Sequence, residues 1–168
     1  MLSTMQHTIA TAMSPADIDA VRRLFVEYQA WLGDLVCSQR LAEENASLPR
    51  PYAEPSGVLL VARALGTDPV GCVGVCLHDE DTAEMKRLYV RPESRRAGLG
   101  RRLAERAADE AASLGYSRLV LSTIPTAMAP AVMLYESLGF RETDPFRDHS
   151  HLHAEADMVY LELDLRSP

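Results

Sequence analysis

The segment from residue 84 to residue 114 constrains the fold of this sequence more than any other part. Residues 84–90 form a β-rich run, a short basic loop follows, and residues 98–114 repeat apolar side chains at helical spacing. Gly98 and Gly100 stand where the loop becomes the helix. A second β-rich run comes after the helix. The chain therefore makes a β-α-β crossover, which places two strands parallel in one sheet.

The rest of the chain continues this pattern of strands and helices, with no internal repeat and no linker. Predicted strands cover residues 8–13, 58–63, 70–78, 84–90, 119–123, a segment that begins at Phe140, and 158–165. Predicted helices run from Ser14 to Leu32 and over residues 35–48, 98–114 and 130–138. The order predicts a single α/β domain over residues 1–168, with a mixed sheet of six to seven strands and about four helices.

Positive charge is concentrated in the basic loop and the helix that follows it. Sixteen of the 17 basic residues are arginines, and six of these arginines lie between residues 91 and 106. The whole chain has a net charge of −7, so its surface does not favour nucleic acid. An acidic protein with one arginine cluster is suited to bind an anion at one place. A general preference for arginine over lysine is the alternative explanation.

The basic loop and the start of the helix have the properties of a phosphate site. The first N–H groups of a helix have no partner within it and lie at the positive end of its dipole. Gly98 and Gly100 leave room for a ligand to approach the backbone. A Walker loop is absent, and Leu103 stands where a dinucleotide fingerprint needs its third glycine. The alternative is a tight strand-to-helix turn with solvated arginines.

Two motifs resemble those of the GNAT N-acetyltransferase superfamily. Residues 95–100 read Arg-x-x-Gly-x-Gly, which is similar to its acetyl-CoA motif. Residues 131–140 read Ala-x-x-Leu-Tyr-x-x-Leu-Gly-Phe, which is similar to its second signature. The order of elements fits over nearly the whole chain. The resemblance implies a GNAT-like fold in which two central strands, 88–90 and 119–123, splay apart.

The same resemblance implies a site for acetyl-CoA as co-substrate, with no metal. It implies that the main chain of the first splayed strand binds the pantetheine arm, through Leu88, Tyr89 and Val90. It implies that main-chain N–H groups of the loop hold the pyrophosphate, through Arg95, Arg96, Ala97, Gly98, Leu99, Gly100 and Arg101. A backbone N–H near Leu88 would then polarise the thioester carbonyl.

Acyl transfer from a thioester to an amine needs an acid and a base. Tyr135 matches the usual general acid of the superfamily, and a phenol with an unperturbed pKa of about 10 suits a departing thiolate. A tyrosine that only packs in the core is the alternative.

Glu84 is the candidate base, since some branches of the superfamily have their base glutamate at this distance from the glycine motif. Strand alternation would place Glu84, Lys86, Leu88 and Val90 on one face, where Lys86 could hold Glu84 ionised. The alternatives are a solvated carboxylate at the strand end and a chain of water molecules in place of a discrete base.

Other residues carry narrower predictions. Met128 stands where many members of the superfamily have an asparagine, so Ser122 or Thr123 would take over its role. Trp31 is expected in the core rather than stacked on a ligand. The loop histidines are expected to line the acceptor cleft rather than to bind a metal, since no fourth ligand is evident; they are His149, His151 and His153.

The sequence therefore predicts an N-acetyltransferase that moves an acetyl group from acetyl-CoA directly to a primary amine. The acceptor is a small molecule or a peptide, and the acidic net charge favours a cationic one. The alternatives are a longer acyl-CoA as donor and a non-catalytic acyl-CoA-binding or regulatory module. No nucleic acid and no membrane partner is expected, and the chain is expected to be a monomer or a homodimer.

The cysteines favour a reducing compartment. Their number is odd, and Cys72 and Cys76 lie about 13 Å apart along one predicted strand, which is too far for a disulfide. Both are expected to be small core residues. No basic and apolar leader is evident at the N-terminus, so a cytoplasmic location is expected.

Overall fold

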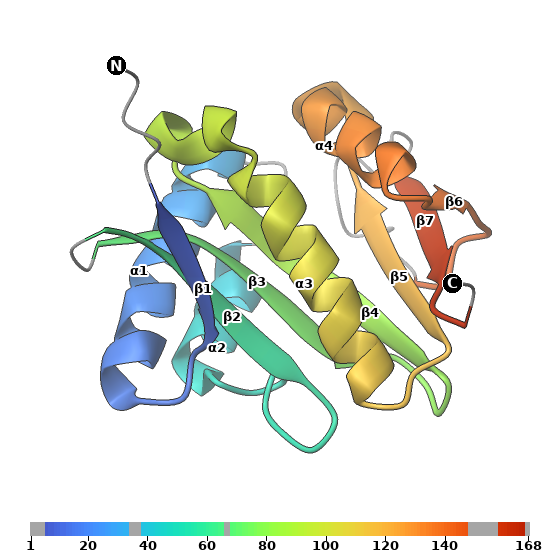
Figure 1. The fold of residues 1–168 in the computed structure, drawn as a ribbon, viewed down its shortest axis with the longest axis horizontal. Helices are drawn as coiled ribbons and strands as arrows, with labels where there is room; N and C mark the ends of the chain where they lie inside the picture. Colours follow the sequence, from blue (N-terminus) through green and yellow to red (C-terminus); the bar gives the residue numbers. More distant parts are fainter. Residues whose placement is uncertain (1–5, 34–37, 66–67, 148–157, 167–168) are drawn as a thin grey trace.

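The structure is a computed structural model, and it describes residues 6–33, 38–65, 68–147 and 158–166. These residues form one seven-stranded sheet with helices on both faces (Figure 1). The strands are β1 (His7–Thr11), β2 (Val58–Ala64), β3 (Pro69–Leu77), β4 (Thr82–Val90), β5 (Arg118–Thr123), β6 (Arg141–Glu142) and β7 (Val159–Asp164). The helices are α1 (Pro15–Leu32), α2 (Ser38–Ser47), the 3-10 helix η2 (Pro92–Ala97), α3 (Leu99–Ser113) and α4 (Pro125–Ser137). The predicted single α/β architecture is confirmed.

The sheet opens between two central strands. Its order is β1-β2-β3-β4-β5-β7-β6, and among the described strands only β4 and β5 are parallel neighbours, as the predicted crossover requires. They pair only from Thr82 with Arg118 to Glu84 with Val120. Beyond Glu84 the two strands diverge (Figure 1). The second half of β4 therefore has no described strand partner on the side of β5, and the predicted splayed pair is confirmed.

Helices pack on both faces of β4. Helix α3 buries Leu99 and Leu103 in the larger core cluster, and α1 buries Leu24 and Phe25 in a second cluster on the opposite face of the sheet. Figure 1 shows α3 in front of the sheet and α1 and α2 behind it. Side chains of β4 therefore face α3 or the α1 and α2 layer according to their position along the strand.

Local signals placed some helix ends correctly and others not. The predicted start of α1 is confirmed, because the Ser14 side chain accepts a hydrogen bond from the Asp17 N–H at 3.1 Å. Helix α4 begins at Pro125 rather than at Pro130. Met128 has a non-helical backbone (φ −134°, ψ 35°), so Pro130 starts only the second part of a kinked helix. The predicted basic loop is the 3-10 helix η2.

A β-bulge in β4 overturns the predicted alternation of its side chains. Arg87 has a φ of 62°, and the pairing of β4 with β3 shifts by one residue around it. Glu84 and Lys86 face the layer of α1 and α2, whereas Leu88 and Val90 pack with the core cluster under α3. The prediction that all four share one face is wrong, because the extra residue in the bulge reverses the faces beyond it.

The described cysteines behave as small core residues. Cys72 and Cys76 are buried with free thiols, as predicted, and burial raises the pKa of the Cys76 thiol to about 11. Cys37 and the three loop histidines lie outside the described residues. Within the described ranges, no helix is both long enough and apolar enough to span a bilayer.

Candidate active site

The gap between β4 and β5 opens into a first cleft of about 350 Å³. Its lining comes mainly from β4, the start of α3, β5 and α4. Five of the residues predicted to hold acetyl-CoA line it: Leu88, Tyr89, Val90, Arg95 and Gly100. Because β5 pairs with β4 only as far as Glu84, the backbone of residues 88–90 can hydrogen-bond a ligand in this cleft.

The other five predicted cofactor residues do not line the first cleft; they are Arg96, Ala97, Gly98, Leu99 and Arg101. Leu99 is buried in the core, and the Arg101 guanidinium donates to Ser137 Oγ at 2.9 Å. Gly98 caps α3 with a φ of 69°, and a Cβ at this position would meet nothing within 4 Å. The loop thus offers a left-handed turn with open space in front of it, which suits main-chain binding of an anion.

Arg95 fixes the loop to the strand before it. Its Nε donates to the Val90 carbonyl at 2.9 Å, and its guanidinium carbon lies 5.3 Å from the centre of the Trp31 ring. Trp31 is 47% exposed and lines the first cleft, so the prediction that it lies in the core is wrong. It stacks on Tyr28, with ring centres 6.3 Å apart. The aromatic end of α1 therefore forms part of the cleft wall.

Tyr135 is both a core residue and a cleft residue. Its ring lies in the core cluster, 5.6 Å from the ring of Phe140, and the residue also lines the first cleft. Burial, with a smaller contribution from Tyr28, raises the pKa of its phenol well above the ordinary value. The hydroxyl is therefore protonated at neutral pH, as a general acid must be.

A second cleft of about 450 Å³ lies beside the first. Helix α2, the segment after β6 and Met158 contribute to its lining. The two clefts share a wall made of β4, β5, α1 and α4 side chains: Tyr28, Glu84, Lys86, Arg87, Ser122, Thr123 and Met128. Ligands in the two clefts would meet at this shared wall.

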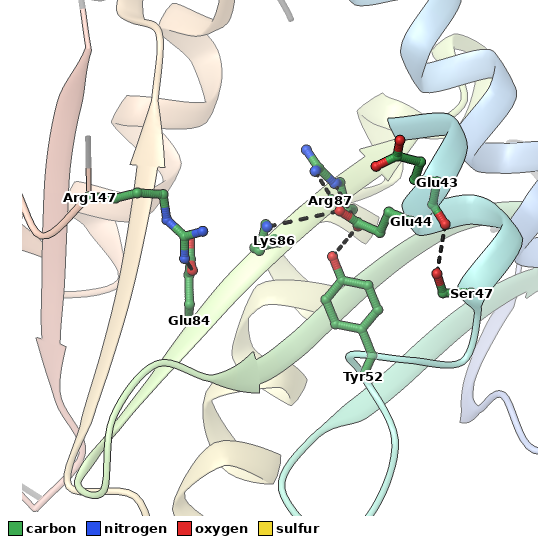
Figure 2. Close-up of polar contacts among 8 residues, drawn as sticks. All are labelled: Glu43, Glu44, Ser47, Tyr52, Glu84, Lys86, Arg87 and Arg147. Atoms are coloured by element: carbon green, nitrogen blue, oxygen red, sulfur yellow. Dashed lines mark hydrogen bonds and ion pairs between the residues drawn. The ribbon is translucent and has the colours of Figure 1, made fainter. Parts of the chain in front are cut away.

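Glu84 sits in the shared wall but not with the predicted partner. Its carboxylate pairs with the Arg147 guanidinium, and Lys86 instead lies 3.9 Å from a carboxylate oxygen of Glu44 (Figure 2). Glu84 is only 2% exposed, so the alternative of a solvated carboxylate is wrong. The hydroxyl of Tyr160 donates to the Arg147 carbonyl at 3.2 Å and so holds the segment that carries this guanidinium.

Sequence reasoning missed a second carboxylate in the same region. Glu44 of α2 accepts two hydrogen bonds from Arg87, at 2.9 and 2.8 Å, and a further one from the Tyr52 hydroxyl (Figure 2). Burial opposes ionisation of Glu44, but the Arg87 hydrogen bond and the charges of Arg87 and Lys86 outweigh it and lower its pKa. Only the bulge aims Arg87 at α2, and no sequence signal marked the bulge.

Met128 occupies the position where the resemblance implied an asparagine. The Thr123 hydroxyl donates to its sulfur at 3.4 Å, and Ser122, Thr123 and Met128 all line both clefts. The two hydroxyls that were predicted to replace the asparagine therefore lie at the shared wall. Within the described ranges, no three metal-ligating side chains converge on a point.

A parallel strand pair that opens beside a glycine-capped helix, with a buried tyrosine at the opening, has the architecture of an acyl-CoA N-acyltransferase. Residues 19–140 match the model of the acetyltransferase (GNAT) family, and the chain belongs to that family. It is similar to an uncharacterised N-acetyltransferase of Schizosaccharomyces pombe, with 37% identity over 166 residues, which are 98% of this chain and 99% of the relative. The protein is therefore a GNAT-type N-acetyltransferase that uses acyl-CoA.

Solved structures show the same fold. An acetyltransferase of the GNAT family from Staphylococcus aureus superposes with a TM-score of 0.78 and 16% identity, over 96% of this chain and 100% of its own. A protein from Salmonella typhimurium, solved with its cofactor acetyl-CoA, superposes with a TM-score of 0.69 and 24% identity, over 97% of this chain and 96% of its own. Both likenesses extend over nearly the whole chain.

Proposed function

We propose that this enzyme transfers the acetyl group of acetyl-CoA directly to a primary amine. The observation that carries the proposal is the wall shared by the two clefts, to which β4, β5 and α4 all contribute. A donor in the first cleft and an acceptor in the second would meet there, so the acetyl group need not rest on the enzyme.

The position of the first cleft and the main-chain groups around it suit acetyl-CoA. The main chain of Leu88, Tyr89 and Val90, which has no described strand partner on the side of β5, would hold the pantetheine arm. The pyrophosphate would lie at the start of α3, where the open space beside Gly98 admits it to the N–H groups of residues 95–101. When bound, acetyl-CoA supplies an activated acetyl group as a thioester, and a backbone N–H near Leu88 would polarise its carbonyl.

Glu84 and Tyr135 would move the two protons. Glu84 takes a proton from the acceptor ammonium, directly or through water. The amine nitrogen then bonds to the acetyl carbon, the bond from that carbon to sulfur breaks, and Tyr135 gives its phenolic proton to the departing thiolate. The second proton of the nitrogen passes to the Tyr135 phenolate, directly or through water, and the proton on Glu84 passes to solvent, which leaves the neutral amide and resets both residues. The place of Tyr135 in the lining of the first cleft and the Arg147 contact that holds Glu84 in the shared wall support these roles.

The proposal is tested with the whole chain and a donor series. Acetyl-CoA should raise the melting temperature and release free thiol in the presence of a panel of amines, amino acids and peptide N-termini. No shift of the melting temperature at millimolar acetyl-CoA would contradict the cofactor assignment. A higher kcat/KM with a longer acyl-CoA would identify that acyl-CoA, rather than acetyl-CoA, as the donor. Binding of acetyl-CoA without thiol release would indicate a non-catalytic module.

A further inference from the structure

The charges that line the second cleft differ in sign from the charge of the whole protein. The chain has a net charge of −7. Among the described residues, the second cleft is lined by four cationic side chains, Arg40, Lys86, Arg87 and Arg147, against three carboxylates, Glu43, Glu44 and Glu84. In a chain with an excess of acidic residues, the described part of this cleft thus carries an excess of one cation.

Arginine already neutralises the two carboxylates nearest to the shared wall. Glu44 is held by both nitrogens of the Arg87 fork and by Tyr52, and Glu84 is held by Arg147 (Figure 2). A second positive charge on an acceptor, as in a polyamine, could pair with Glu44 or Glu84 only by displacing one of these arginines, which costs free energy. The region beside the shared wall therefore disfavours a second cationic group on the acceptor.

Among the described residues, Lys86 is the one cation of the shared wall that belongs to neither of these arginine–carboxylate pairs. Its ammonium lies 3.9 Å from Glu44 Oε2, an oxygen to which Arg87 Nη2 already donates at 2.8 Å. Its side chain is 21% exposed and lines both clefts. An anionic group at the junction of the clefts would gain a charge-assisted contact with this ammonium, in surroundings drier than bulk water.

We propose that the acceptor is an amine that also carries a carboxylate, such as a free amino acid, and that Lys86 binds this carboxylate at the shared wall. The inference rests on the proposed function, because it places the acceptor amine beside the donor cleft. The volume of the second cleft, about 450 Å³, is in the range of small-molecule sites, roughly 300–1,000 Å³. The acidic net charge of the chain favours a cationic acceptor. The side chains that line this cleft instead favour an amine that also carries a carboxylate.

Matched acceptor pairs that differ by one charge test the inference. We would measure kcat/KM for acetylation of alanine, leucine, phenylalanine and glutamate, each against its own α-amide, with glutamine against glutamate for a side-chain carboxylate. At least one carboxylate should exceed its amide by roughly 10- to 100-fold, because a site built for a polar group rejects the analogue that lacks it. Amides or simple alkylamines that are acetylated equally well or better would overturn the inference.

Variants of Lys86 assign the preference to this side chain. Lys86→Met should raise KM for the preferred carboxylate and reduce the ratio of acid to amide by about tenfold, and Lys86→Arg should restore most of that ratio. Arg23→Met removes one positive charge from the exposed surface of α1 and should leave the ratio unchanged. A ratio that survives in Lys86→Met would overturn the assignment.

The donor half of the reaction separates this inference from the proposed function. If acetyl-CoA raises the melting temperature and amides or amines are acetylated while amino acids are not, only the inference fails. If acetyl-CoA binds and none of these acceptors is acetylated, the amino-acid assignment also fails. If acetyl-CoA neither binds nor releases thiol, the proposed function fails and the inference with it.

Discussion

The two clefts that meet at β4 are built by different kinds of interaction. The first cleft is lined by the second half of β4, by Gly100 in the first turn of α3 and by aromatic rings, and most of the groups predicted to bind acetyl-CoA are main-chain groups. The second cleft is held by ion pairs between distant parts of the chain, Glu44 with Arg87 and Glu84 with Arg147. A site that binds the same donor in every reaction can depend on backbone geometry. A site that selects the acceptor depends on its particular side chains.

The largest expected effect is on acetyl-CoA affinity and comes from a substitution at Gly98. A matched control separates the role of the backbone turn from a general loss of stability. Gly98→Val should lower acetyl-CoA affinity by at least about 100-fold, because a β-branched residue disfavours the φ of 69° and its side chain enters the space in front of the turn. Titration calorimetry measures the affinity. Gly115→Val is the matched control, since Gly115 also has a positive φ, of 97°, and open space, but it follows the C-terminal end of α3, whereas Gly98 caps the N-terminal end where the phosphate groups are expected.

The control should lose stability and keep acetyl-CoA affinity. Full affinity in Gly98→Val would show that the phosphate groups bind elsewhere. An equal loss of affinity in both variants would show that the effect comes from the fold rather than from the turn.

Tyr135→Phe tests the acid that the first cleft contributes. The substitution should lower kcat by about 100-fold and change acetyl-CoA affinity less than twofold, since the ring stays packed against Phe140 while the proton donor is lost. Steady-state kinetics and calorimetry measure the two effects. Tyr116→Phe removes another buried hydroxyl, one that donates to the Ser56 carbonyl at 2.7 Å, and should leave kcat unchanged. An unchanged kcat in Tyr135→Phe would make this residue part of the core only.

Glu84→Gln tests the base on the side of the second cleft. The variant should lower kcat by about 30-fold at neutral pH, and the deficit should shrink as the pH rises, because the acceptor ammonium then loses its proton in solution without help. The measurement is a pH profile of kcat with saturating acceptor. A deficit that is the same at every pH would assign Glu84 to positioning of Arg147 rather than to proton transfer.

Glu44→Gln has the smallest expected effect, and it acts on stability. The pKa of Glu44 is lowered in the folded state, so its pairing stabilises the fold above the ordinary glutamate pKa and is lost as the pH falls through the folded pKa. The free energy of unfolding should fall by about 2 kcal/mol at pH 7, and the difference from the parent chain should narrow below about pH 4. Chemical denaturation at both pH values measures it.

An exposed ion pair provides the control for this stability effect. Glu105→Gln breaks the contact with Arg101, in which both side chains are 47% exposed, and should change stability little. Equal losses in the two variants would mean that the Glu44 cluster is no stronger than a surface pair.

Local sequence signals predicted the phosphate loop, the resemblance to the GNAT superfamily implied the splayed strands of the first cleft, and long-range pairing built the second cleft. The capping residue Ser14, the glycine turn at Gly98 and the motif that contains Tyr135 are each read within about ten residues, so their structures follow from local rules. Arg147 lies 63 residues from Glu84, and Glu44 lies 43 residues from Arg87. Nothing in the sequence around either carboxylate identifies such a partner.

The errors within β4 have one physical cause. Period-two alternation assumes a regular strand, and the bulge at Arg87 adds one residue that turns this side chain toward Glu44 and turns Leu88 and Val90 toward α3. Arg87 is not a glycine, so its positive φ leaves no mark in the composition of the strand. Trp31 was misplaced for a related reason: its exposure follows from the cleft that α1 borders and not from its place on the helix.

Initial-velocity kinetics test most directly whether the two clefts act together. Acetyl-CoA and the best acceptor are varied against each other, and thiol release is recorded. Direct transfer across the shared wall requires both ligands to be bound at once, so the double-reciprocal lines should intersect. Parallel lines, together with an acetylated enzyme that forms in the absence of acceptor, would contradict this account.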